Sequence, residues 1–89
     1  MKKSERRPAV AGKILIVDDV ATNRIVLKVK LAAAYYETVQ AETGAEALAS
    51  ARSLRPELML LDVELPDMDG IAVCEALKAD PATRDIPVV

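Results

Sequence analysis

The chain has 89 residues with 12 basic and 14 acidic side chains, a formal net charge of −2, no histidine and a single cysteine, Cys74. This length accommodates one small domain, and a near-neutral charge without a basic stripe argues against a nucleic-acid partner. No apolar run reaches the ~18 residues of a membrane span, the chain does not open on a secretory signal, and Cys74 has no partner for an internal disulfide. We therefore expect a cytoplasmic protein that does not associate with membranes.

The first twelve residues differ in character from the rest of the chain. They carry four basic side chains and end in Gly12, and their apolar residues follow neither a strand period nor a helix period. This composition predicts a flexible N-terminal arm over residues 1–12 and a folded domain over residues 13–89.

The first predicted strand covers residues 14–17, an uninterrupted apolar run that is typical of a strand buried on both faces. A helix is expected from residue 21 to about residue 33, because apolar residues recur there at helical spacing. Its inward face is expected to carry Ile25, Val29 and Ala32, with Leu27 and Leu31 beside them. The basic side chains of this helix, among them Arg24, are expected to face solvent.

A weakly alternating segment at residues 35–41 favours an edge-like strand, and a second helix follows it. Thr43 and Glu46 form a capping box, in which Thr43 accepts from a free helix amide and Glu46 reaches back to the amide of Thr43. Pro56 is expected to end this helix. The inward face is expected to carry Ala47, Leu48, Ala51 and Leu54.

The remaining segments complete an alternation of strands and helices. A second fully buried strand is predicted at residues 58–61, a loop rich in turn formers at residues 63–70, and the start of a further strand at residues 86–89. The intervening helix is expected to present Ile71, Cys74 and Leu77 on one face. Crossovers of helical length demand a parallel sheet, so the predicted fold class is a doubly wound α/β sheet.

Three carboxylates follow directly after two of the buried strands: Asp18 and Asp19 after the first, and Asp62 after residues 58–61. Open α/β sheets build their sites at these strand ends, and acids that meet there repel one another unless a cation intervenes. Mg²⁺ fits best, because it binds through a few carboxylates and keeps several waters. A metal-poised aspartate can then attack a phosphoryl group and form an acyl phosphate.

The arrangement also suggests which carboxylate does what. Asp62 stands alone and is the predicted nucleophile, whereas the pair Asp18 and Asp19 is suited to holding Mg²⁺ together with Asp62 and the backbone carbonyl of Glu64. The alternative is that Asp18 and Asp19 only cap the first helix and that Asp62 is a turn residue.

Four segments together resemble the receiver domain of bacterial two-component response regulators: ILIVDD at 14–19, TGAEAL at 43–48, LLDVELPDMDG at 60–70 and DIPVV at 85–89. The segment 80–87 and the pair Asn23-Arg24 look most like receivers of PleD-type diguanylate cyclase regulators. The resemblance implies a flavodoxin-like sheet with strand order 2-1-3-4, incomplete after the fourth strand. It also implies a phosphorelay domain, not an enzyme, in which Asp62 accepts a phosphoryl group from a sensor histidine kinase or histidine phosphotransfer protein, and Asp18, Asp19 and the Glu64 carbonyl hold Mg²⁺.

The sequence also departs from this family. A receiver normally continues to a Thr or Ser after the fourth strand and a Lys after the fifth, and neither position is present here. We therefore expect the usual conformational switch to be lost and the apolar edge at residues 86–89 to pair with another copy. The alternative function is a non-switching fragment that oligomerises or titrates kinases. A phosphohydrolase is disfavoured because Glu64 stands where such enzymes need a second Asp, and an ATPase because no Gly-x-x-x-x-Gly-Lys loop is present.

Overall fold

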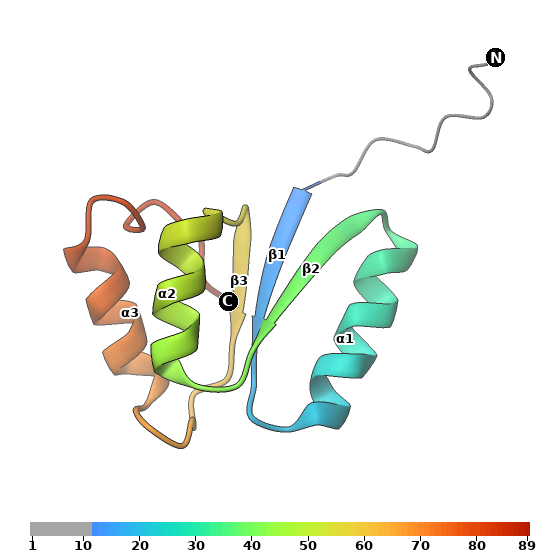
Figure 1. The fold of residues 1–89 in the computed structure, drawn as a ribbon, viewed down its shortest axis with the longest axis horizontal. Coiled ribbons are helices and arrows are strands. Elements are labelled where there is room, and N and C mark those ends of the chain that lie inside the picture. The colour runs from blue at the N-terminus through green and yellow to red at the C-terminus, as the bar shows by residue number, and fades with distance from the viewer. Residues whose placement is uncertain (1–11) are drawn as a thin grey trace, which may run out of the picture.

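The computed structural model describes residues 12–89, so the predicted arm lies outside the described residues except for Gly12, which is the first residue of a strand. The elements follow in the order β1 (Gly12–Val17), α1 (Ala21–Ala33), β2 (Tyr36–Ala41), α2 (Gly44–Leu54), β3 (Leu58–Leu61) and α3 (Gly70–Ala79). The strands form one parallel sheet in the order β2-β1-β3. Figure 1 shows α1 on one side of this sheet and α2 and α3 on the other, which confirms the predicted doubly wound α/β fold.

The central strand β1 is covered on both faces. Residues 14–17 are each at most 2% exposed, as expected for an apolar run between two helical layers. Leu15 and Val17 pack with Met59 in the cluster that α2 and α3 cover. Because side chains alternate along a strand, Ile14 and Ile16 point to the opposite face, where α1 lies (Figure 1).

Helix α2 begins with the predicted Thr43 cap and ends just before Pro56. Thr43 Oγ1 accepts from the Glu46 amide at 3.1 Å, but Glu46 Oε1 accepts from the amide of Glu42 at 2.8 Å and not from that of Thr43. Arg55 leaves the helix in a left-handed conformation with φ 49°. Three predicted inward residues of α2 are confirmed: Ala47 and Ala51 are buried, and Leu48 is partly buried against the core.

Two predicted inward positions, one in α2 and one in α3, are wrong. Leu54 in the last turn of α2 is 36% exposed, so this end of the helix reaches past the core. In α3 the buried face runs through Gly70, Val73 and Leu77, and Ile71 is 68% exposed. Apolar residues at helical spacing occur on two faces of α3, one beginning at Gly70 and one at Ile71. The face that begins at Gly70 is the one that packs on the sheet.

The inward face of α1 also differs from the prediction. Ile25 and Val29 are 57% and 63% exposed, and the least exposed positions of the helix are Arg24, Leu27 and Leu31. The predicted and the observed inward residues lie on neighbouring faces of the same helix. The observed face is the one on which Arg24 forms hydrogen bonds to Asp18 O, just beyond β1, and to Gln40 in β2.

Residues 86–89 lie where the fourth strand was expected, although only a single bridge, Met59 to Val88, is formed. The Met59 amide donates to Pro87 O, the Val89 amide to Met59 O and the Leu61 amide to Val89 O, each at 2.9 Å. This segment therefore lies beside β3, whose other neighbour is β1. No helix in residues 12–89 is long and apolar enough to cross a membrane.

Candidate functional site

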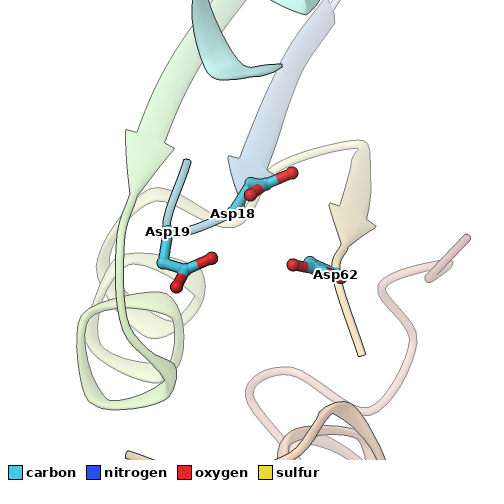
Figure 2. A group of neighbouring side chains, drawn as sticks. All are labelled: Asp18, Asp19 and Asp62. Carbon is cyan, nitrogen blue, oxygen red and sulfur yellow. The ribbon is translucent and has the colours of Figure 1, made fainter. Parts of the chain in front are cut away.

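The sheet brings the three predicted carboxylates to one edge. Val17 is paired with Leu61 at the ends of β1 and β3, and the Asp62 amide donates to Val17 O at 2.9 Å. Asp18, Asp19 and Asp62 each offer one carboxylate oxygen, and these oxygens all lie within 4.8 Å of one another. Figure 2 shows the side chains turned toward the shared space beyond the strand ends.

This donor set fits a hard divalent cation. Asp19 is exposed and the other two acids are partly buried, so three negative charges repel one another without full screening by water. Two oxygens bound to one Mg²⁺ at about 2.1 Å lie at most about 4.2 Å apart, so a span of up to 4.8 Å requires only a small side-chain rotation or one bridging water. The arrangement can hold a cation and present an anionic oxygen beside it.

The first and last of these acids differ in how many hydrogen bonds they already accept. Asp18 Oδ1 accepts from the Val20 amide at 2.9 Å, and Oδ2 accepts from Asn23 Nδ2 at 3.1 Å. Asp18 thus supports the turn into α1 without capping the helix, whose N-cap is Val20 with no side-chain hydrogen bond, and each Asp18 oxygen keeps a lone pair for a metal. Within residues 12–89, the Asp62 carboxylate accepts only one bond, from the Glu64 amide at 3.5 Å.

The loop after β3, residues 62–70, folds back on itself. It begins with Asp62, the nucleophile and phosphoryl acceptor predicted from the sequence, and is called the acceptor loop below. The Gly70 amide donates to Val63 O at 2.7 Å, and Glu64 forms a bridge with Asp69. Asp69 also caps α3 by accepting from the Ala72 amide at 2.8 Å. Glu64 is exposed and lies in the first half of this loop, beside Asp62.

A comparison with protein-family models matches residues 14–89 to the response regulator receiver domain. The chain belongs to this family. The receiver domain is 50% identical over 80 residues to the response regulator PleD of Caulobacter vibrioides, an alignment that covers 90% of this chain and 18% of that protein. The resemblance drawn from the sequence is thereby confirmed.

Solved structures agree with this assignment. The N-terminal domain of a response regulator receiver protein from Methanoculleus marisnigri is 40% identical with a TM-score of 0.85, over 88% of this chain and 63% of that one. The receiver domain of a sensor histidine kinase from Pseudomonas aeruginosa, with a magnesium ion coordinated in its active site cleft, is 28% identical with a TM-score of 0.82, over 86% and 63%. The chain thus has the flavodoxin-like fold of receivers in incomplete form, and it spans less than two thirds of these relatives.

Sequence reasoning missed the role of Arg24 in this receiver domain. Its side chain is 11% exposed, so the expected solvated position is wrong. Arg24 Nη1 donates to the backbone oxygen of Asp18 at 2.8 Å, and Nε donates to Gln40 Oε1 at 3.0 Å, while Nη2 lies 3.5 Å from Glu42 Oε2. The guanidinium therefore ties the main chain at Asp18 to β2. Only the likeness of the pair Asn23-Arg24 to receivers pointed to it beforehand.

Asp67 is a second residue that the sequence did not single out. Its Oδ1 accepts from the Gly44 amide at 2.7 Å, and its Oδ2 accepts from the Ala45 amide at 2.9 Å. These hydrogen bonds hold the pKa of the Asp67 carboxyl below its usual value, and the bond from the Gly44 amide has the larger effect. They join residues more than twenty positions apart, so no local pattern announces them.

Proposed function

We propose that this receiver domain accepts a phosphoryl group on Asp62 in a Mg²⁺-dependent step of two-component signalling. The observation that carries the proposal is the convergence of Asp18, Asp19 and Asp62, with Asp62 the less hydrogen-bonded end of the cluster compared with Asp18. The carboxylate oxygen of Asp62 attacks phosphorus while the P–N bond of a phosphohistidine breaks, and the released imidazole takes a proton.

The proposed metal ligands are Asp18, Asp19, Asp62 and the backbone carbonyl of Glu64. Bound Mg²⁺ would offset the charge on the phosphoryl oxygens during transfer. The fit of the oxygen donors to a hard cation supports this assignment, as does the magnesium named for the Pseudomonas aeruginosa receiver. The described residues position these groups through the Asn23 bond to Asp18 and the fold of the acceptor loop.

The proposed phosphodonor is a sensor histidine kinase or a histidine phosphotransfer protein, because receivers in general interact with these proteins. The chain has no histidine of its own, so a phosphohistidine has to come from a partner. Two expectations stay predictions: that the domain is not an enzyme, and that it is located in the cytoplasm.

The test uses the purified chain, Mg²⁺ and a small acyl phosphate, with intact mass as the measurement. We expect a gain of one phosphoryl group that requires Mg²⁺ and is absent from Asp62→Asn. Asp69→Asn is the matched control, because it removes a carboxylate of the same loop that lies outside the cluster, and asparagine caps helices as well as aspartate. Labelling that persists in Asp62→Asn, or no labelling of the unmodified chain, would overturn the proposal.

Self-association through the segment 86–89 also stays a prediction. An apolar groove of about 550 Å³ lies between α3 and this segment, lined by Leu61, Val63, Ile71, Cys74, Val88 and Val89. A second copy of this chain could cover the groove and so remove apolar surface from water. Light scattering that gives the monomer mass at micromolar concentration would contradict the prediction. The alternative function as a non-switching, kinase-titrating fragment is not favoured.

A further inference from the structure

The tip of the acceptor loop is docked on the N-terminus of α2. In the described residues, both hydrogen bonds from α2 to this loop are accepted by Asp67, at 2.7 and 2.9 Å. Met68 packs beside them against Gly44, where a Cβ atom would overlap the Met68 side chain. Figure 1 shows the loop passing from β3 to α3 at the same end of the molecule at which α2 begins.

This contact links the acceptor loop to the other strand end of the candidate site. Asp67 is hydrogen-bonded to Gly44 at the start of α2, and a short connection joins Gly44 to Ala41, the last residue of β2. Ala41 O accepts from the Asp18 amide at 3.1 Å. The tip of the acceptor loop is thus linked to the main chain that carries Asp18, while the base of the loop carries Asp62.

We propose that Asp67 is a positioning residue of the phosphoacceptor site, which holds the acceptor loop on α2 and thereby sets the place of the Glu64 main chain relative to Asp18 and Asp19. This inference rests on the proposed function, because it assigns Asp67 a part in Mg²⁺ binding. Asp67 itself lies outside the cluster of Asp18, Asp19 and Asp62, and both of its oxygens accept from amides of α2, so its part in the site is indirect.

The physical reason lies in the geometry that Mg²⁺ demands. The ion accepts little departure from octahedral coordination, so a displaced carbonyl ligand costs affinity. The base of the loop is held by the Gly70–Val63 hydrogen bond and the Glu64–Asp69 bridge, and Leu65 and Met68 are only partly buried. Without Asp67, the tip is held by apolar contacts alone, which restrict position less than two short hydrogen bonds do.

The test measures the Mg²⁺ dissociation constant by calorimetry, with Mg²⁺ alone as the ligand. We expect Asp67→Ala to raise this constant roughly 10-fold, the lower end of the range for residues that support metal ligands. Asp67→Asn keeps one oxygen acceptor, so its Mg²⁺ affinity should lie between those of Asp67→Ala and the unmodified chain. If the alanine variant does not fold, Asp67→Asn still tests the proposal.

Two controls separate positioning from other effects. Thr43→Ala removes a different cap from the same helix without touching the loop, so it should lower stability and leave Mg²⁺ affinity unchanged. Asp69→Asn removes one negative charge from the same loop and keeps the cap of α3, so its affinity should exceed that of Asp67→Asn.

The outcomes distinguish this inference from the proposed function. Equal Mg²⁺ affinity of Asp67→Ala and the unmodified chain would overturn the positioning role alone. Equal losses in Asp67→Asn and Asp69→Asn would overturn it as well, because charge would then explain the effect. An unmodified chain that binds no Mg²⁺ would instead overturn the proposed function on which the inference depends.

Discussion

Replacing Gly70 with alanine should destabilise the protein and displace the main chain at Asp62, the proposed phosphoryl acceptor. Gly70 is buried at the start of α3, and a Cβ atom there would lie 2.9 Å from Val63 Cα and 3.2 Å from Asp62 O. Both neighbours are backbone atoms, so relief requires the main chain of the acceptor loop to move. Gly12 provides a matched control, because its Cβ would also meet an atom at 2.9 Å, but that atom is Glu57 Cγ in an exposed, flexible side chain.

The size of the effect follows from these contacts. Overpacking against atoms that cannot move costs about 1–3 kcal/mol, and exchanging glycine for alanine in a helix returns about 0.5–1 kcal/mol. We expect Gly70→Ala to lower the free energy of unfolding by about 1–2 kcal/mol, which corresponds to a fall in Tm of roughly 4–15 °C for a domain of this size. Gly12→Ala should stay within about 0.5 kcal/mol of the unmodified chain.

Urea unfolding followed by far-UV circular dichroism measures both variants, and intact mass after treatment with the acyl phosphate measures Asp62 labelling. Labelling should be slower in Gly70→Ala and unchanged in Gly12→Ala. The reasoning is refuted if both variants lose the same stability, or if Gly70→Ala is as stable as the unmodified chain.

Two further predictions concern single polar side chains. Thr83 is buried and its hydroxyl donates to Leu77 O at 2.8 Å, so Thr83→Val should cost about 1 kcal/mol in the free energy of unfolding, and equal or higher stability in urea would contradict this. The amides of Gly44 and Ala45 lower the pKa of Asp67, so the stabilisation from its carboxylate is fully present above the usual pKa of about 3.9 and is lost as the pH falls through the lower folded value. The stability advantage over Asp67→Asn should therefore shrink in unfolding curves measured from pH 6 down to pH 3, and a constant advantage would show that the carboxylate is not responsible.

Much of the fold and the position of the carboxylates followed from the chain alone. Two uninterrupted apolar runs, at residues 14–17 and 58–61, marked two strands, and helical crossovers required them to be parallel. The first run is buried on both faces as expected, whereas in the second only Met59 is buried and the other three residues are partly exposed. Because parallel strands end at the same edge of a sheet, the acids after them, Asp18, Asp19 and Asp62, were expected to meet. These inferences depend only on local hydrophobicity and on the direction of the strands.

Tertiary structure alone decided which face of a helix is buried and which side chains support the site. In α1 and α3 the apolar residues form two series with helical spacing, and only packing on the sheet selects between them. Arg24 and Asp67 act through hydrogen bonds to residues 16 and 22–23 positions away, beyond the reach of any local period. Such contacts exist only once the sheet has brought distant segments together, so the positions of the acids could be predicted from the sequence, whereas these hydrogen bonds could not.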